Sequence, residues 1–225
     1  MLEPRYLFTQ DFSTLRAGLL ALPHRVRRFA RGEFLWAPGE PFERVHFFES
    51  GLARTSVLGR TGEAARVIAW AGPGTMFPVV HGNRFEIESR IVTEAVSPVV
   101  TLEFPAGALE EHLGASPEFA AATIDWYAKF VNLLLFSAAD VARAPALPAL
   151  ASTLLLLFRN EAGAALARGD ALETTQPELA RLIGIDRASL VRALSALRRY
   201  GAVATTRGRI ELLDLEALRR AARTP

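Results

Sequence analysis

The stretch from Thr174 to Leu197, TTQPELARLIGIDRASLVRALSAL, constrains the fold more than any other part of the sequence. Thr175 is placed to cap a first helix with its hydroxyl, and Glu178, three residues later, can reach back to the amide of the cap. Gly184 supplies the positive φ that a sharp turn needs. Asp186 then caps a second helix. The sequence therefore predicts two short helices joined by a tight turn.

The second predicted helix has an apolar side and a polar side. Its buried stripe is expected at Leu190, Ala193, Leu194 and Leu197. The opposite face and the exposed N-terminal end then carry Arg187, Ala188, Val191 and Arg192. This arrangement is typical of a helix-turn-helix, whose second helix places its N-terminal residues on base edges in the major groove. An ordinary helical hairpin is the alternative. Because arginine binds the guanine edge, Arg187 and Arg192 are the candidate base readers.

The residues after this pair of helices predict a wing. Residues 202–206 and 209–213 are short β-prone runs on either side of Arg207-Gly208. Arg207 and Arg209 at this tip are candidate phosphate contacts. Residues 146–225 carry 12 arginines against 8 acidic residues, a net charge of +4, whereas residues 1–145 have a net charge of −2. The positive half contains the predicted reading helix, which agrees with nucleic-acid binding.

Upstream, after a helical stretch near Phe12–Leu22, the pattern changes to short β-prone runs separated by glycine and proline turns. The runs lie near residues 27–30, 34–37, 44–49, 51–58, 65–69, 75–80, 89–95 and 99–104. Such close and regular spacing predicts a compact antiparallel barrel or roll.

From Pro117 the apolar residues recur with the period of a helix. A seam with alternating steps of four and three residues runs through Ala120, Ile124, Tyr127, Val131, Leu134, Ala138 and Val141. It predicts a long helix that pairs with a second copy of the chain. The alternative is a helix buried on its own sheet domain, because a second apolar face is formed by Phe119, Trp126, Phe130 and Leu133.

Prolines 145 and 148 interrupt the helical pattern and indicate a hinge. Helices are expected again near residues 149–166 and 215–222. The predicted domains are residues 1–116, a sheet domain; residues 117–144, the dimerisation helix; and residues 145–225, a winged helix-turn-helix domain.

Composition and motifs exclude several classes of function. The chain has 225 residues, half of them apolar, and no cysteine, which excludes disulfides, thiol catalysis and a cysteine-ligated iron–sulfur cluster. No catalytic motif is found, so an enzyme is not expected. The N-terminus lacks a signal-peptide layout, and the longest apolar stretches, near Val131–Ala139 and Leu154–Phe158, are shorter than the roughly 18 residues of a membrane span. A cytoplasmic location without membrane contact is therefore expected.

The order of these parts resembles the superfamily of the cyclic-AMP receptor protein and the fumarate–nitrate reduction regulator, CRP/FNR. The resemblance covers nearly the whole chain and is carried by Gly32-Glu33-x-Leu35-x-x-Pro38-Gly39-Glu40 through Phe48-x-x-Gly51, by Pro73-Gly74-x-x-Phe77, by Thr153-Leu154-Leu155 and by Thr175 to Leu197. It implies an α+β fold with an N-terminal antiparallel β-roll of the cyclic-nucleotide-binding type, a long dimerisation helix and a C-terminal winged helix-turn-helix.

The same resemblance implies a homodimeric transcription regulator that binds a palindromic operator in double-stranded DNA and contacts RNA polymerase. Together with the wing, it makes the candidate DNA-binding residues Thr175, Gln176, Asp186, Arg187, Ala188, Ser189, Arg192, Arg207 and Arg209. Ala188 stands where the cyclic-AMP receptor protein has a glutamate that recognises cytosine. Because an alanine cannot accept a hydrogen bond, the half-site should differ at that base step.

The effector site departs from the family pattern. Phe77-Pro78-Val79-Val80 replaces the Gly-Glu pair that holds the ribose, and Glu86 to Arg90 places carboxylates near the expected phosphate clamp. Cyclic AMP is therefore not expected. An apolar effector, a haem or no effector fits better, and the candidate effector-binding residues are Phe77, Val79, Tyr127, Phe130 and Leu134.

Two alternative functions stay open at this point. One is a haem-based gas sensor of the same fold, with His81 as the haem ligand, because a ligand in one group of relatives lies near this position. The other is a ligand-binding or protein-interaction module that does not bind DNA. No metal site is predicted, because His24, His46 and His112 lack metal-ligand spacing and are expected to be surface or hydrogen-bonded histidines.

Overall fold

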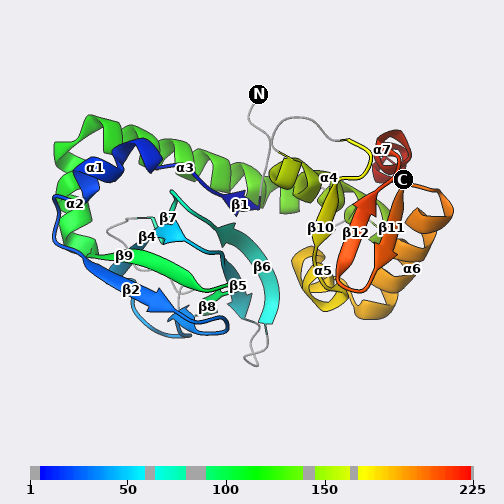
Figure 1. Ribbon diagram of the computed structural model, residues 1–225, viewed down its shortest axis with the longest axis horizontal. Helices are drawn as coiled ribbons and strands as arrows, with labels where there is room; N and C mark the ends of the chain where they lie inside the picture. The colour runs from blue at the N-terminus through cyan, green and yellow to red at the C-terminus, as the bar shows by residue number, and fades with distance from the viewer. Residues whose placement is uncertain (1–5, 59–63, 80–89, 139–144, 163–166, 224–225) are drawn as a thin grey trace. The chain divides into compact units, whose positions relative to one another are not determined.

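The computed structural model describes residues 6–58, 64–79, 90–138, 145–162 and 167–223. Its contacts divide the chain into two compact units. One unit is Leu7–Val131, here called the roll unit, and the other joins Met1–Tyr6 to Asn132–Pro225, here called the winged-helix unit. Figure 1 labels the helices and strands of both. The domain boundaries expected from the sequence stay predictions.

The described strands of the roll unit form two sheets. The first has the order β1-β6-β5-β8-β3 and consists of β1 (Leu7–Phe8), β3 (Phe34–Trp36), β5 (Ala53–Leu58), β6 (Ala64–Ala71) and β8 (Ile91–Ala95). The second has the order β2-β9-β4-β7 and consists of β2 (Arg25–Phe29), β4 (Arg44–Ser50), β7 (Met76–Phe77) and β9 (Val99–Pro105). The predicted antiparallel roll is confirmed, and β2 to β9 fall on the eight predicted runs.

Strand β1 was not predicted, and it pairs in parallel with β6. It is only two residues long, so it has no alternation that a sequence pattern could reveal. The core of the unit is rich in fully buried aromatic side chains, among them Trp36, Phe47, Phe48 and Phe104.

Gly51 shows why one glycine of the family-like pattern is required. Its φ is +85°, and a Cβ added there would lie 2.1 Å from the carbonyl oxygen of Pro98. A left-handed conformation and a close backbone approach together admit only glycine. The chain can therefore turn directly from β4 into β5.

The described helices of the roll unit are η1 (Ser13–Leu15), α1 (Arg16–Leu19), α2 (Ala106–Ala115) and the greater part of α3 (Pro117–Phe136). The helical stretch expected near Phe12–Leu22 contains only the short η1 and α1. Helix α2 was not predicted, because its sequence AGALEEHLGA contains two glycines and only one buried residue, Leu109. Helix α3 begins at Pro117 as expected and is regular to Phe136.

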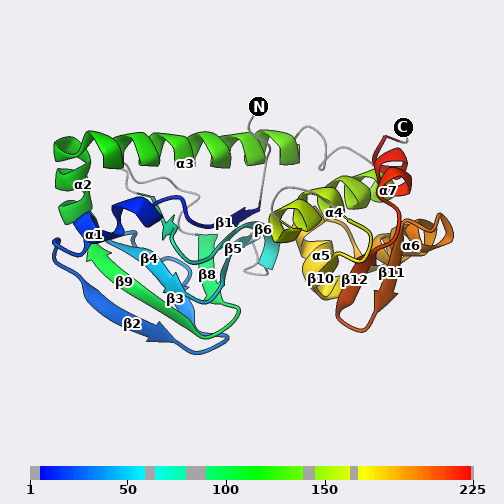
Figure 2. The same cartoon turned by 45° about the horizontal axis from the view of Figure 1, so that its top comes forward.

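Helix α3 lies along β1 in both views (Figure 1 and Figure 2). The ring of Trp126 lies 4.9 Å from that of Phe8, and its Nε1 donates to Thr75 Oγ1 at 3.2 Å. Thr75 donates in turn to Asp11 Oδ2 at 2.9 Å, and Lys129 Nζ lies 3.3 Å from Asp11 Oδ1. One side of α3 is therefore fixed to the roll by aromatic packing and a buried polar chain.

Helix α3 is also long and apolar enough to cross a membrane by length and composition, with a mean hydropathy of 1.2 over its most apolar window. The apolar stretches found in the sequence are shorter than this helix, because the charged residues Asp125 and Lys129 interrupt the run of apolar residues. A helix that packs on the core of a protein has the same length and composition, and α3 packs on the roll through Trp126.

The winged-helix unit contains a helical bundle and a small sheet. Its elements are α4 (Ala146–Ala162), β10 (Ala171–Glu173), α5 (Gln176–Ile183), α6 (Arg187–Arg199), β11 (Val203–Thr206), β12 (Arg209–Leu212) and α7 (Leu215–Ala222). The strands form an antiparallel sheet of order β10-β12-β11. The predicted winged helix-turn-helix is confirmed, with the three-residue β10 as an addition that was too short to be read from the sequence.

Candidate nucleic-acid interface

The start of α5 is fixed by the two residues that the sequence singled out. Thr175 Oγ1 accepts a hydrogen bond from the amide of Glu178 at 3.3 Å, and Glu178 Oε2 accepts one from the amide of Thr175 at 2.9 Å. The predicted capping box is therefore confirmed. Gly184 ends α5 with a φ of +79°, and its amide donates to the carbonyl oxygen of Ala180 at 2.8 Å. The turn between the helices thus follows from local sequence.

The first turn of α6 carries a chain of polar contacts that ends on an arginine. Asp186 caps the helix, accepting from the amide of Ser189 at 2.8 Å and from its hydroxyl at 2.6 Å. Arg192 donates from its guanidinium to Ser189 Oγ at 2.9 Å. The hydrogen bonds from Ser189 lower the pKa of Asp186 below its usual value. Asp186 and Ser189 therefore orient Arg192 as well as starting the helix.

The buried stripe predicted for α6 is confirmed, since its members are at most 4% exposed: Leu190, Ala193, Leu194 and Leu197. Arg187, Ala188, Val191 and Arg192 are exposed. The first turns of α6 therefore present two arginines and two apolar side chains on the outer face of the helix.

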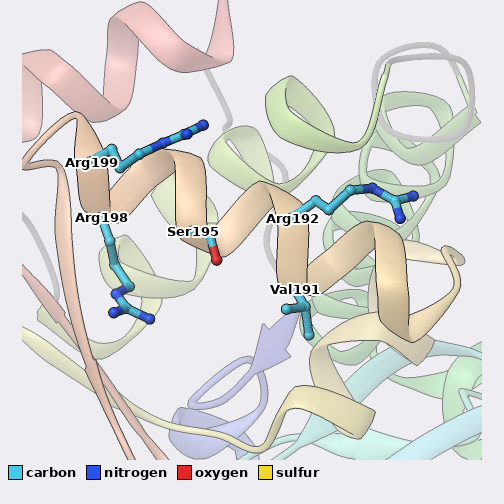
Figure 3. Close-up of a pocket in the computed structure, with 5 residues that line it drawn as sticks. All are labelled: Val191, Arg192, Ser195, Arg198 and Arg199. Carbon is cyan, nitrogen blue, oxygen red and sulfur yellow. The ribbon is translucent and has the colours of Figure 1, made fainter.

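A hollow runs along the outer face of α6, and its lining extends beyond the predicted site (Figure 3). It is lined by Val191, Arg192, Ser195, Arg198 and Arg199. In Figure 3 the side chains of Val191, Ser195 and Arg198 lie in one line along the helix, next to a second line with Arg192 and Arg199. Ser195, Arg198 and Arg199 were not among the predicted site residues. Continuing the exposed stripe in steps of three and four residues would have found them.

A second hollow brings the predicted phosphate contacts together. Its lining joins the start of α5 and two residues of α6 to the wing: Thr174, Thr175, Gln176, Pro177, Arg187, Leu194, Thr205, Thr206, Arg207, Gly208, Arg209 and Ile210. Arg209 Nη1 also lies 3.2 Å from Glu173 Oε1, and this acidic neighbour was not predicted from the sequence. Arg207 lies at the tip of the wing, next to Gly208, whose φ is +76°.

The candidate effector residues do not all come together. Phe77 and Val79 are buried, and Tyr127 donates from its hydroxyl to the carbonyl oxygen of Val79 at 3.0 Å. Phe130 stacks on Trp126 with ring centroids 5.1 Å apart, and Trp126 in turn lies near Phe77. Leu134 is 41% exposed and belongs to the other compact unit. Val80, His81 and Glu86 lie outside the described residues.

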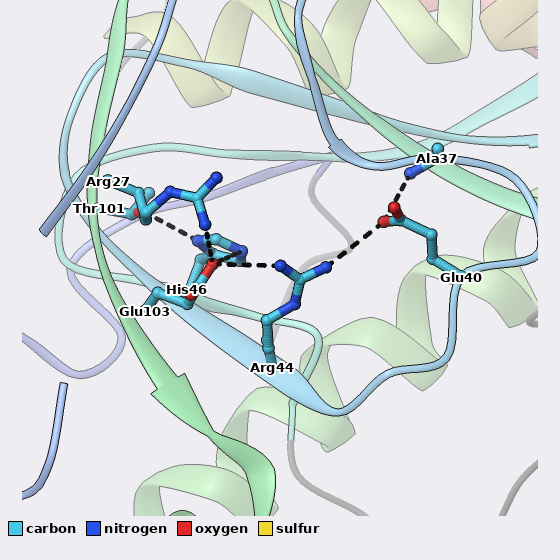
Figure 4. A network of polar contacts seen from close by, with 7 residues as sticks. All are labelled: Arg27, Ala37, Glu40, Arg44, His46, Thr101 and Glu103. Atoms are coloured by element: carbon cyan, nitrogen blue, oxygen red, sulfur yellow. Dashed lines mark hydrogen bonds and ion pairs between the residues drawn. The ribbon is translucent and has the colours of Figure 1, made fainter. Parts of the chain in front are cut away.

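The roll contains a buried histidine in a polar network on its second sheet (Figure 4). His46 Nδ1 lies 2.8 Å from Thr101 Oγ1, and Glu103 is paired with Arg27 at 3.0 Å and with Arg44 at 3.7 Å. Burial, helped by Arg44 and Arg27, lowers the pKa of His46 to about 3. His46 is thus a neutral core histidine. His24 is hydrogen-bonded as well, because its Nδ1 lies 2.8 Å from the carbonyl oxygen of Leu22. In the described part of the chain no three metal-ligating side chains cluster.

The predicted dimer seam is divided between two faces of α3. Ile124, Val131 and Leu134 are 69%, 49% and 41% exposed, whereas Tyr127 faces the roll through its bond to Val79. Ala138 is exposed, and Val141 lies outside the described residues. Leu135, which the sequence reading left out of the seam, is 64% exposed. The exposed apolar line of α3 therefore runs through Ala121, Ile124, Ala128, Val131, Leu135 and Ala138.

Comparison with known proteins agrees with this geometry. Residues 149–221 match the Crp-like helix-turn-helix domain. The global nitrogen regulator of Nostoc sp. is 28% identical over 183 residues, which are 79% of this chain and 80% of that protein. A solved CRP-family transcriptional regulator from Thermus thermophilus is 25% identical, with a TM-score of 0.68 over 88% of this chain and 97% of that chain. Residues 149–221 thus match a Crp-like helix-turn-helix domain, and the chain is similar over most of its length to regulators of the CRP/FNR type.

Further CRP/FNR structures share the fold at lower identity. CLP of Xanthomonas campestris, described as a c-di-GMP responsive global regulator, is 18% identical, with a TM-score of 0.74 over 89% of this chain and 99% of CLP. The relatives are transcription regulators, which agrees with the sequence-based expectation of a regulator and not of an enzyme. The chain accordingly has the fold of a CRP/FNR-type transcription regulator, with a helix-turn-helix domain at residues 149–221.

Proposed function

We propose that this CRP/FNR chain acts as a homodimer that reads a palindromic operator with Arg187 and Arg192 of α6. The observation that carries the proposal is the outer face of α6, where both arginines are exposed while the opposite stripe is buried. A helix that buries one side and exposes arginines at its N-terminal end has the form that enters a major groove. Residues 145–225 would read DNA, residues 117–144 would pair the two copies, and residues 1–116 would sense an effector.

The contacts around α6 support this reading. Arg192 is held in place by Ser189 and Asp186, so less side-chain freedom would be lost when it binds a base. The hollow between α5 and the wing collects hydroxyl, amide and guanidinium groups, which are the groups that bind phosphate oxygens. Base readers and phosphate contacts would therefore approach one duplex from adjoining surfaces.

The test is selection of bound sequences from random duplex DNA, followed by affinity measurements on the enriched site. We expect an inverted repeat with half-sites about one helical turn apart. Arg187→Ala and Arg192→Ala should each cost about 1–3 kcal/mol of discrimination at a guanine step. Arg28→Ala, which removes an exposed arginine from β2, is the matched control and should change nothing. Unchanged operator binding by both α6 variants would contradict the assignment.

The proposed homodimer rests on the exposed apolar line of α3. Large apolar side chains exposed at steps of three and four residues along one helix form a coiled-coil seam. Ile124→Asp and Leu135→Asp should therefore convert a dimer into a monomer in sedimentation experiments. Val26→Asp on β2, where the side chain is 52% exposed, is the control and should leave the dimer intact. A dimer that survives both α3 changes would exclude this seam.

We further propose that the regulator responds to an effector other than cyclic AMP, or to none. The ring of Trp126 contacts those of Phe77 and Phe130, two of the candidate effector residues, and these aromatic surroundings favour an apolar ligand over a phosphate. Calorimetric titration with cyclic AMP should show no binding, and the absorption spectrum of the purified protein should show whether a haem is carried. RNA polymerase is the proposed partner at the promoter, to be tested by binding of both proteins to one operator fragment.

A further inference from the structure

Val191 differs from the other residues on the outer face of α6 because its side chain is large and apolar. It is 40% exposed, and it is the one large apolar side chain of α6 that is exposed among the described residues. Its neighbours on this face are charged or small, with Arg187 one turn earlier and Arg192 next to it. An apolar side chain held in water at the centre of a binding face gains free energy when a partner covers it.

Ala188 extends this apolar spot. It lies three residues before Val191, so the two side chains are neighbours on the helix surface, and Ala188 is exposed as well. Neither side chain can donate or accept a hydrogen bond. The face of α6 therefore presents a carbon-only surface bordered by two guanidinium groups, one of which is held by Ser189.

Base edges in the major groove offer one complementary feature to such a surface. They present hydrogen-bond donors, acceptors and the 5-methyl group of thymine, and only the methyl group is apolar. We propose that Val191, together with Ala188, reads the 5-methyl group of a pyrimidine at a base step next to those read by Arg187 and Arg192. The recognised class is thymine or 5-methylcytosine, as opposed to uracil or unmodified cytosine. This inference rests on the proposed reading of DNA by α6.

The test removes the methyl group and the side chain separately and together. In the selected operator, the thymines of each half-site are replaced one position at a time by deoxyuridine, which leaves every hydrogen-bonding group in place. At one position the original protein should bind about fourfold more weakly for each half-site changed, the effect of one buried methyl group. Val191→Ala should lose most of this difference, because only Ala188 and the shortened side chain remain to contact the methyl group.

A second arm adds a methyl group instead of removing one. At the same step, a cytosine–guanine pair is compared with its 5-methylcytosine form, and methylation should strengthen binding of the original protein by a similar factor and that of Val191→Ala much less. Alanine suits an exposed helical position, so the variant should keep its fold. Val26→Ala, which shortens an exposed valine of β2, should behave as the original protein in both arms.

The outcomes separate this inference from the function on which it rests. If no inverted repeat is enriched, the proposed reading of DNA fails first. If an operator is bound but no deoxyuridine position weakens binding, recognition of a methyl group is overturned while the regulator stands. A methyl effect that persists at full size in Val191→Ala would likewise overturn the role of Val191.

Discussion

The winged-helix unit and the roll unit obtain their shapes in different ways. In α5 and α6 the polar groups that set the geometry lie three residues apart, as in Thr175 with Glu178 and Asp186 with Ser189. In the roll they come from distant parts of the chain, since His46 meets Thr101 and α3 is tied to Thr75 through Trp126. The surface of α6 is thus specified by local sequence, whereas the interior of the roll exists only after long-range pairing.

The two regions also differ in where the polar groups lie. The contacts around α6 are exposed, so water competes with each of them. In the roll, Thr101 is fully buried and His46 is 1% exposed, so their hydrogen bond replaces hydration that was lost on folding. Changes in the roll should therefore affect mainly stability, and changes on α6 mainly binding.

The largest effect is expected from a core substitution that tests whether the two units unfold independently. Phe48 is fully buried in β4, and Phe48→Ala should lower the free energy of unfolding by about 3–5 kcal/mol. All three tryptophans of the chain, Trp36, Trp70 and Trp126, lie in the roll unit, so their fluorescence follows its unfolding. Leu197→Ala in α6 is the counterpart and should leave this transition in place. Equal shifts in the two variants would show that the units unfold together.

The next effect is a dependence of stability on pH that arises in the roll. The folded pKa of His46, about 3, lies below the unfolded value of 6.5, so the unfolded chain binds the additional proton between these values. The contribution of His46 to the free energy of unfolding is therefore full well above pH 6.5. The free energy of unfolding should fall by about 2 kcal/mol by pH 5. Denaturation followed by tryptophan fluorescence at pH 8 and pH 5 measures it. His46→Gln should flatten the profile, and an unchanged slope in that variant would assign the dependence to another group.

A smaller effect is expected from the cap of α5. Thr175→Ala removes the hydroxyl that accepts from the amide of Glu178 and should destabilise the winged-helix unit by about 1 kcal/mol. Thr175→Ser keeps the hydroxyl and should restore most of the loss. Thermal unfolding followed by circular dichroism measures both variants. Equal midpoints for alanine and serine would show that the turn is held by tertiary packing and not by its local cap.

The smallest effect is expected at the wing. If Arg207 contacts a phosphate, Arg207→Ala should reduce the slope of the logarithm of affinity against the logarithm of salt concentration by about 0.9 for each arginine removed. The preferred operator sequence should stay the same, because phosphate contacts carry no sequence information. Binding titrations at several salt concentrations test this. A changed base preference would place Arg207 in a groove.

The sequence predicted those parts of the fold in which short-range chemistry decides. The cap of α5, the turn at Gly184 and the buried stripe of α6 depend on residues within a turn or two of each other, and the structure confirms them. Strands β2 to β9 also lie on predicted runs, because turns rich in glycine and proline separate them. Helix α2 was missed, since glycines weaken its pattern, and β1 and β10 are too short to show one.

Helix α3 shows what the sequence could not decide. Both of its faces are apolar, so a heptad pattern fits more than one register. Packing of Trp126 on Phe8 and the hydrogen bond from Tyr127 to Val79 turn one face toward the roll and leave Ile124 and Leu135 exposed. The sequence by itself determined helix α6, because capping and periodicity act between near neighbours. Only the tertiary structure decided which face of α3 stays exposed and that His46 is buried, because both depend on which distant side chains occupy the same space.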